Sequence, residues 1–257
     1  MCAYDTLVRV RRIEQDGVAY LEFDVLRALG GVRHGSFLRH GGCSTGPFNS
    51  LNFSSSTGDA LDAVAANIAR VKAIMGVTTL CRLQQSHGSH IVIADPACVE
   101  AGDGLVTNQP GVALLILHAD CQAALFFDPK QRVIAAVHCG WRGNVANIYA
   151  QAVQVMERSY GTVPADVRVA ISPSLGPQAA EFRNYHTELP SSFLPFRVGP
   201  THFDLWAVAL MQLKAAGIRE EHVEIAGLCT YTAQEDCYSY RREKMGGRHG
   251  TLIVLDP

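Results

Sequence analysis

The sequence predicts an α+β protein with mixed sheets, because short strand-like runs outnumber helical segments and the two do not alternate strictly along the chain. The chain has 257 residues, of which 48% are apolar and 18% are charged, as is typical of a globular protein. No linker rich in glycine, proline or serine and no internal repeat divides it. We therefore expect residues 1–257 to form a single domain.

A β-hairpin is expected near the N-terminus, where strand-like runs at residues 7–10 and 19–23 flank the turn dipeptide Asp16-Gly17. Three later segments repeat apolar residues at helical spacing, and a glycine just beyond each of them is suited to end a helix. Asp59 is the expected N-cap of the first. The three expected helices cover residues 61–75, 144–160 and 204–216.

Further apolar runs of strand length, bounded by glycine, proline, aspartate or serine, predict the remaining strands. They lie at residues 91–94, 112–117, 123–127, 133–137, 167–171, 223–226 and 251–255. The third and fourth of these runs flank a short polar turn and are expected to pair as antiparallel strands. If Asp128 pairs with Gln131, the numbers of paired residues sum to 259, and Cys121 then faces His138 at the open end of the hairpin.

A thiol opposite an imidazole needs a third group before a metal site can be proposed. The segment Gln84–His90 offers two candidates, His87 and His90. His87 is preferred because the neighbouring Gly88 permits a close approach of the backbone. Two neutral imidazoles and a thiolate would bind Zn²⁺ and leave a fourth position open, as in catalytic zinc sites. Water bound there would be a nucleophile at neutral pH.

The charge and cysteine content exclude several classes of protein. A net charge of −2 and a pI near 6.5 give no general attraction to nucleic acid or anionic lipid. The longest apolar runs are too short to cross a bilayer, and the first residues lack a secretory signal, so we expect a cytoplasmic protein with no membrane partner. Eight scattered cysteines contain no CxxC pair, which argues against a zinc ribbon or a disulfide scaffold.

A series of motifs runs in order through residues 35–255: Gly41-Gly-Cys-Ser-Thr-Gly46, Ser50-Leu-Asn52, Gln85-Ser-His-Gly88, Asp103-Gly-Leu-Val-Thr107, Ala119-Asp-Cys121, His138-Cys-Gly-Trp-Arg-Gly143, Tyr238-Ser-Tyr-Arg-Arg242 and Gly247-Arg248. Together they resemble the laccase-domain, or polyphenol-oxidase-like, family. The resemblance implies a compact α/β/β/α sandwich and a metal site, usually zinc, with ligands corresponding to His87, Cys121 and His138.

The resemblance also implies purine nucleoside chemistry: phosphorolysis of adenosine, inosine and methylthioadenosine, and deamination of adenosine. A bacterial branch of the family is linked to editing of peptidoglycan precursors. This chain departs from the usual family motifs at four positions. Cys43 and Ser86 stand where the family usually has valine, and Cys139 stands where it has alanine. Ala123 lies where a proline usually follows the Ala-Asp-Cys motif. All three implied ligands remain.

Several functions stay open at this point. The preferred one is a zinc-dependent purine nucleoside phosphorylase with adenosine deaminase activity. A second is an amidase acting on peptidoglycan precursors, through the zinc site or through a Cys121–His138 pair as nucleophile and base. A third is a copper polyphenol oxidase, although the ten histidines contain no His-x-His pair and copper uptake is expected to be adventitious. A binding protein without activity is the fourth.

Phosphate is expected near Arg142, because the guanidinium and the start of the helix expected over residues 144–160 both favour an anion. Further arginine candidates are Arg39, Arg241, Arg242 and Arg248. Ser44, Asn52 and Gln85 are candidates for contacts with ribose or base.

Asp103 and Asp120 are expected to orient a ligand imidazole or act as a general base. The expected catalytic set is therefore Cys121, His138, Arg142 and Asp103. Trp141 either walls the pocket or packs, and structural roles are expected for His34, His40, His90, His118, His186, His202, His222 and His249.

Overall fold

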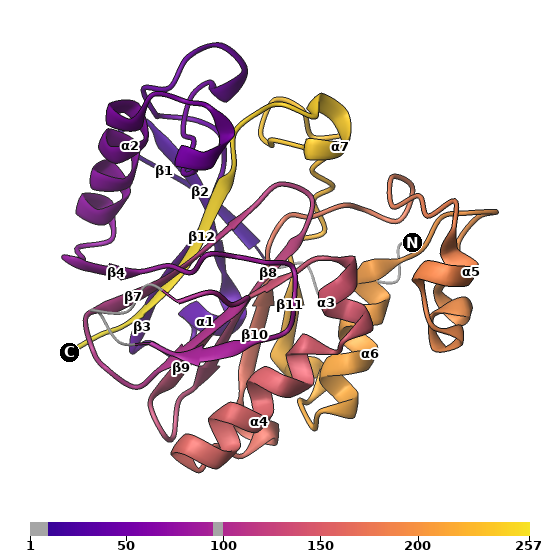
Figure 1. Ribbon diagram of the computed structural model, residues 1–257. Helices are drawn as coiled ribbons and strands as arrows, with labels where there is room; N and C mark the ends of the chain where they lie inside the picture. The colour runs from indigo at the N-terminus through magenta and orange to yellow at the C-terminus, as the bar shows by residue number, and fades with distance from the viewer. Residues whose placement is uncertain (1–9, 95–99) are drawn as a thin grey trace.

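Two six-stranded sheets lie against each other in the computed structural model, which describes residues 10–94 and 100–257 (Figure 1). The first has the strand order β1-β2-β3-β12-β7-β4, and the second β11-β10-β8-β9-β6-β5. The strands are β1 Val10–Gln15, β2 Val18–Phe23, β3 Val32–Phe37, β4 Thr79–Cys81, β5 Ile91–Ile93, β6 Gly104–Thr107, β7 Val112–His118, β8 Gln122–Asp128, β9 Val133–Cys139, β10 Arg168–Ile171, β11 Val223–Ile225 and β12 His249–Leu255.

Both sheets are mixed, as predicted. Most neighbouring strands are antiparallel, and the parallel pairs β4 with β7, β5 with β6, and β10 with β11 lie at the sheet edges. The N-terminal hairpin is confirmed, with Gln15 paired to Val18 across the turn. Its first strand covers Val10–Gln15 rather than ending at Val10, and residues 7–9 of the predicted run lie outside the described residues. Asp16 and Gly17 both have positive φ, which the turn requires and which this dipeptide tolerates.

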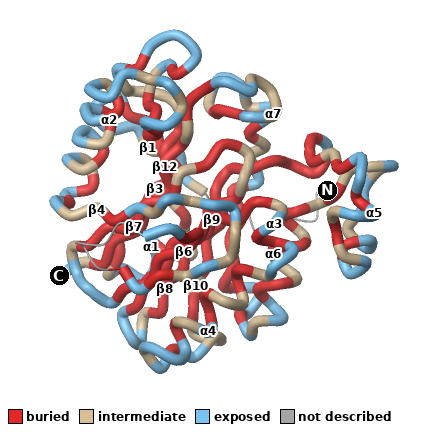
Figure 2. Tube along the Cα trace, viewed as in Figure 1, coloured by how far each residue is buried: buried red, intermediate tan, exposed pale blue. Residues whose placement is uncertain are grey.

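Helices cover the outer face of each sheet, so that the molecule has four layers (Figure 1). Leu114 of β7 and Leu125 of β8 meet in the apolar core between the sheets. Val71 of α2 packs on the first sheet, while Ala152 of α4 and Ala209 of α6 pack on the second. Figure 2 shows that the strands are mostly buried and that the outer sides of α2 and α4 are exposed. The layers are those of the α/β/β/α sandwich that the resemblance implies.

The helices are α1 Asp24–Arg27, α2 Leu61–Ile74, α3 Trp141–Val145, α4 Ile148–Tyr160, α5 Tyr185–Glu188, α6 Leu205–Ala215 and α7 Tyr240–Glu243, with 3-10 turns at η1 Gly46–Phe48, η2 Ser55–Thr57, η3 Pro164–Asp166, η4 Ser191–Phe196 and η5 Glu220–His222. The first and third expected helices are confirmed as α2 and α6. The predicted N-cap of α2 is wrong: Ala60 occupies that position, and Asp59 instead accepts a hydrogen bond from the Asn52 side chain (2.9 Å).

The second expected helix is interrupted, contrary to the prediction of one helix over residues 144–160. Asn147 lies between α3 and α4 with a φ of 52°, in the left-handed region, and its side chain accepts a hydrogen bond from the N–H of Ala150 to cap α4. Val145 consequently stays 42% exposed rather than joining the apolar face. Gly161 ends α4 in the left-handed conformation, as predicted.

Strands β3, β4 and β6 are absent from the sequence prediction. β3 contains Arg33, His34 and Gly35, which interrupt its apolar pattern. β4 has three residues, and β6 begins with Gly104. Each pairs with a strand that the sequence does predict, so tertiary pairing rather than local propensity fixes them.

Two buried histidines are held in the neutral form. His34 Nε2 accepts the N–H of Phe23 (2.8 Å), and His249 Nε2 accepts the N–H of Tyr238 (2.8 Å) while its Nδ1–H donates to the carbonyl of Phe37 (2.9 Å). Burial lowers the pKa of both imidazoles to about 4. A proton added at Nε2 would face a backbone N–H in each case.

We therefore expect the free energy of unfolding to fall as pH drops below about 6.5, where histidines of the unfolded chain begin to bind protons that the folded chain refuses until about pH 4. The loss should reach about 2 kcal/mol per histidine at pH 5. Urea unfolding at pH 7 and pH 5, with a chelator present, measures it. The His34→Gln variant should show a weaker pH dependence, and equal stability of the natural chain at both pH values would contradict the prediction.

Candidate metal centre

The β8–β9 hairpin presents two of the expected ligands, but in a register two residues from the predicted one. Ala123 pairs with His138 and Asp128 with Val133, so the paired numbers sum to 261 rather than 259. The turn is longer than expected because Asp128 Oδ1 accepts the N–H groups of Lys130 and Gln131. Its last residue, Arg132, takes a positive φ, and β9 starts only at Val133.

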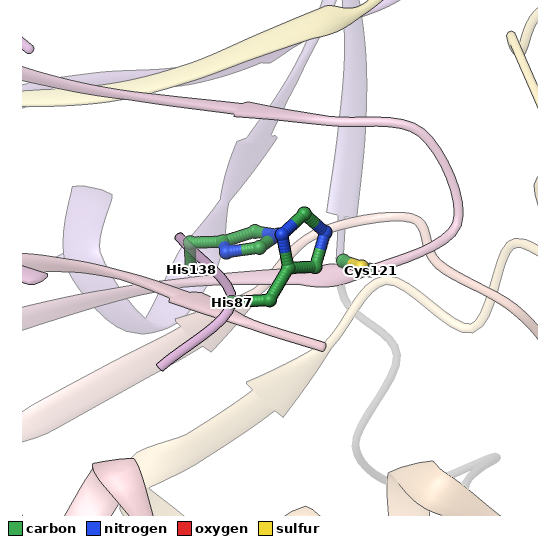
Figure 3. Close-up of side chains that lie close together, drawn as sticks. All are labelled: His87, Cys121 and His138. Carbon is green, nitrogen blue, oxygen red and sulfur yellow. The ribbon is translucent and has the colours of Figure 1, made fainter. Parts of the chain in front are cut away.

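Three side chains from separate segments nevertheless come together at the end of this hairpin (Figure 3). One ligand atom from each of His87, Cys121 and His138 lies within 4.8 Å of the others. The two imidazole rings meet edge to face, with centroids 4.7 Å apart. His138 is buried, Cys121 is half-buried and His87 is exposed. We call these three residues the His–Cys–His cluster, and its open side is that of His87.

Asp103 holds two members of the cluster, His87 and His138, through hydrogen bonds to its carboxylate. Its carboxylate is fully buried and accepts the N–H groups of Ser86 (3.3 Å), His87 (2.9 Å) and Gly88 (2.7 Å) in succession, together with the Ser86 hydroxyl (2.9 Å). Its Oδ1 also accepts Nδ1–H of His138 at 2.8 Å. This arrangement holds His87 in the left-handed region, at a φ of 61°, and fixes the tautomer of His138.

Without a metal, the charges in the cluster favour a Cys121 thiolate beside a protonated His138 imidazolium. Burial alone would raise the pKa of the Cys121 thiol, but His138 and His87 more than offset this and lower it well below its usual range. Burial would lower the pKa of His138, whereas the Cys121 sulfur and the Asp103 carboxylate raise it above its usual range. The pKa of Asp103 is itself held low, since hydrogen bonds from His138, Gly88 and Ser86 outweigh its burial.

The residues present fit a metal ion. A thiolate and two imidazoles are ligands that zinc and copper both accept, and three protein ligands leave a position open for a reactant. A carboxylate on the second nitrogen of a ligating histidine is the usual support for such a site, and Asp103 supplies it to His138. Within residues 10–94 and 100–257 this is the one group of histidine, cysteine and acidic side chains close enough to share an ion.

Cys139, the last residue of β9, and Gly140, which follows it, have different roles beside the cluster. A Cβ at Gly140 would lie 3.1 Å from Cys121 Sγ and 3.3 Å from His87 Cδ2, so a side chain there would crowd both groups. Cys139 packs in the core between the second sheet and its helices, and burial raises the pKa of its thiol far above the usual range. Because alternate residues of a strand point to opposite faces, Cys139 faces away from its neighbour His138.

The structure places Ser44, Asn52 and Gln85 in hydrogen bonds within the protein. Ser44 is buried and accepts from the Asn67 side chain (2.9 Å). Asn52, also buried, accepts the N–H of Arg248 (2.8 Å) and donates to loop acceptors. Gln85 pairs its amide with both backbone groups of Leu117 (2.7 and 2.8 Å). Their side chains therefore hold the loops and β7 around the cluster.

Most of the candidate arginines also hold loops, because they donate to backbone carbonyls: Arg39 to Asn49 and Gln234, Arg241 to Ala179 and Glu181, Arg242 to Thr230, Tyr231 and Cys237, and Arg248 to Gly246 and Gly247. Arg142 differs. It is exposed, and its guanidinium carbon lies 4.6 Å from the centre of the Trp141 ring. Among the described residues, none forms a hydrogen bond or ion pair with this guanidinium, although the backbone carbonyl of Arg142 accepts the N–H of Ala146.

The expected setting of Arg142 is partly wrong. Arg142 and Gly143 do not precede a helix but lie inside α3, which begins at Trp141 and has five residues. An anion at this position would therefore depend on the guanidinium rather than on the start of a long helix. Trp141 is half-buried and packs edge to face on Phe182, with centroids 6.4 Å apart.

Asp120 fixes the loop that carries Cys121 rather than touching a ligand imidazole. Its Oδ1 accepts the Thr230 hydroxyl (2.7 Å), and its Oδ2 accepts the N–H of Arg241 (2.6 Å). Sequence reasoning did not identify Thr230 or the Ser86 hydroxyl as part of the site. Nothing in the local pattern marks Thr230, because its partner lies 110 residues away.

Comparison with known proteins places the chain among bacterial relatives of similar length. It is 31% identical over 255 residues to a purine nucleoside phosphorylase of Bacteroides thetaiotaomicron, covering 91% of this chain and 94% of that protein. It is 35% identical over 230 residues to a purine nucleoside phosphorylase of Pseudomonas aeruginosa, covering 84% and 90%. The crystal structure of YlmD from Geobacillus stearothermophilus superposes with a TM-score of 0.87 and 27% identity, covering 95% and 98%.

A second solved structure, YfiH from Bacillus licheniformis, has a TM-score of 0.85 and 25% identity and covers 96% of this chain and 99% of that one. No helix among the described residues is long and apolar enough to cross a membrane. The family model described as "Multi-copper polyphenol oxidoreductase laccase" matches residues 33–256, which include the whole His–Cys–His cluster. On this match and these relatives, the chain belongs to that laccase-like family.

Proposed function

We propose that this protein is a zinc-dependent purine nucleoside phosphorylase in which His87, Cys121 and His138 hold the metal. The His–Cys–His cluster supported by Asp103 is the observation that carries the proposal. The names of the relatives from Bacteroides thetaiotaomicron and Pseudomonas aeruginosa support the reaction class. Adenosine, inosine and methylthioadenosine are the proposed nucleosides, with phosphate as the second substrate.

In the proposed reaction a phosphate oxygen bonds to C1′ of the nucleoside, and the bond between C1′ and the purine nitrogen breaks. The electron pair leaves with the purine, which takes up a proton, and ribose 1-phosphate is the other product. A bound zinc ion would supply Lewis acidity at the open side of the cluster. Arg142, whose guanidinium is free of other partners among the described residues, binds the phosphate, since arginine pairs well with phosphate oxygens.

The residues of the cluster have distinct roles in this scheme. Asp103 keeps the Nδ1–H of His138 engaged, so that Nε2 is left toward Cys121 and the metal. Because His87 is the exposed member of the cluster, substrate approaches the metal from its side. Arg248 adds positive charge near Cys121, because an arginine side chain stays protonated at neutral pH although burial lowers its pKa. We also propose that the same centre deaminates adenosine to inosine as a second reaction.

The proposal predicts that zinc-loaded protein converts adenosine to adenine and ribose 1-phosphate only when phosphate is present. Liquid chromatography of the products, with and without phosphate, measures this, and inosine in either mixture would report deamination. The Arg142→Ala variant should raise the KM for phosphate while leaving zinc content unchanged. Adenine formation at the same rate without phosphate, or no purine product from protein shown to contain zinc, would contradict the proposed reaction.

A second candidate is a hydrolase that uses Cys121 as nucleophile, for example an amidase acting on peptidoglycan precursors. It is favoured by one observation: the Cys121 thiol lies beside His138 and its pKa is lowered. Because the same sulfur would be occupied by zinc, a chelator should abolish the phosphorylase reaction but increase a thiol-dependent one. The copper polyphenol oxidase is less well supported, since the described residues supply one candidate metal group rather than several.

A further inference from the structure

Helix α7 begins beside the metal centre, although Figure 1 shows it at the periphery of the molecule, apart from α4 and α6. The N–H of Arg241, the second residue of α7, donates to Asp120 Oδ2 at 2.6 Å. Asp120 directly precedes Cys121 and takes a φ of 89°, and its other oxygen accepts the Thr230 hydroxyl. These contacts fix the first turn of α7 to the loop that presents Cys121.

Two tyrosines at this turn have opposite environments. Tyr238 is fully buried, and its hydroxyl donates to the carbonyl of Phe48 at 2.6 Å. Ser239 caps α7 by accepting the N–H of Arg242. Tyr240, the first helical residue, is 53% exposed, which is unusual for a large aromatic side chain. Tyr238 therefore stabilises the fold, whereas the side chain of Tyr240 reaches the solvent beside the metal centre.

Cationic groups link the Tyr240 ring to the metal centre. The guanidinium carbon of Arg248 lies 5.6 Å from the ring centroid, and Lys244 Nζ lies 5.4 Å from it. Arg248 is half-buried, and two of its neighbours are Asp120 and Cys121, whose charges act on its guanidinium. The guanidinium of Arg248 therefore interacts electrostatically both with the Tyr240 ring and with the Cys121 loop.

We propose that Tyr240 is a substrate-positioning residue whose ring stacks on the purine base, and that Lys244 and Arg248, whose cationic groups contact this ring, hold it in place. This inference rests on the proposed nucleoside function and names the group that recognises the base. Stacking uses the flat face that adenine and hypoxanthine share, so Tyr240 should serve adenosine and inosine alike. Discrimination between the two bases would need other residues.

The test compares Tyr240→Leu with Tyr240→Phe in zinc-loaded protein. The leucine variant should raise the KM for adenosine and for inosine by about ten- to a hundredfold, because base stacking is lost. Its KM for phosphate, zinc content and melting temperature should stay unchanged. The phenylalanine variant keeps the ring and should stay within about threefold of the natural enzyme. Tyr231→Leu is the matched control, since Tyr231 is an exposed tyrosine (41%) nearby in the sequence.

An unchanged nucleoside KM in Tyr240→Leu would overturn the stacking role, as would an equal defect in Tyr240→Phe. If the natural protein phosphorolyses no nucleoside, the proposed function fails and the base site is tested directly, by calorimetric titration with adenosine. Binding by the natural chain that is lost in Tyr240→Leu and kept in Tyr240→Phe would still support the inference. Equal binding by all three chains, or binding by none, would refute it.

Discussion

Replacing Cys121 with alanine is expected to abolish metal binding and, with it, the metal-dependent activity. Loss of a partner that only supports a ligand already costs about 10–100-fold in metal affinity, and loss of a ligand should cost more. Cys121 is the cleanest position to change, because no described residue depends on its sulfur for a hydrogen bond except the other two members of the cluster. Zinc content after dialysis and the phosphorolysis rate are the two measurements.

Matched variants separate the ligands from their surroundings. His87→Asn should also lose zinc, and asparagine is chosen because it tolerates the left-handed backbone at this position. His90→Ala is its control, since His90 is an exposed histidine three residues away that lies outside the cluster. Cys43→Ala, which removes an exposed thiol outside the cluster, is the control for Cys121. Both controls should bind zinc like the natural chain.

His138→Ala needs a further readout because it removes a group that Asp103 requires. The variant leaves a buried carboxylate with one hydrogen bond fewer, so part of any defect will come from stability. Melting of the metal-free protein measures that part separately. Full zinc retention in the Cys121, His87 and His138 variants together would refute the assignment of the three ligands.

The sequence predicted that His87, Cys121 and His138 lie together, even though it did not predict the geometry that brings them there. The predicted hairpin register is wrong by two residues, yet Cys121 and His138 remain neighbours because a shift of that size keeps both at the same end of the hairpin. Asp103 and Asp120 were both predicted to orient a ligand imidazole, and Asp103 is the one that does so, through His138. The sequence pattern alone could not choose between the two. The position of Asp103 depends on β6, a short strand that begins with glycine and pairs with β9.

Polar loop residues were the least predictable part of the site. Asn52 and Gln85 have the side chains expected of ligand contacts, but the same amides also replace backbone partners where the chain leaves a strand. Only the position of distant backbone groups decides between the two uses. The interruption between α3 and α4 is similar, because the apolar spacing continues across Asn147 while its left-handed backbone ends one helix and starts another.

Asp103→Asn should produce the largest loss of stability among single changes near the metal centre. In the natural chain both carboxylate oxygens only accept hydrogen bonds: Oδ1 from His87 and His138, Oδ2 from Ser86 and Gly88. An asparagine must direct its amide N–H₂ at one of these sets of donors. Breaking a buried charged pair in this way costs about 3–5 kcal/mol, and metal affinity should fall by about 10–100-fold.

Ser86→Ala calibrates the Asp103 effect, since it removes only the hydroxyl donor and should cost about 1 kcal/mol of unfolding free energy.

The pH dependence of stability provides a second check on the role of the Asp103 charge. The pKa of Asp103 is lower in the folded chain than in the unfolded one, so its stabilisation is complete above about pH 4 and is lost as pH falls from there toward the folded value. Urea unfolding of metal-free protein should therefore show a gap in the free energy of unfolding between the natural chain and Asp103→Asn that narrows below about pH 4. The gap should also narrow as pH rises above about 6.5, because Asp103 raises the pKa of His138 and this part of the stabilisation is lost as the imidazolium loses its proton. A gap that persists unchanged at pH 3 would mean that the carboxylate acts through its shape rather than its charge, and the account of how His87 and His138 are held in place would have to be abandoned.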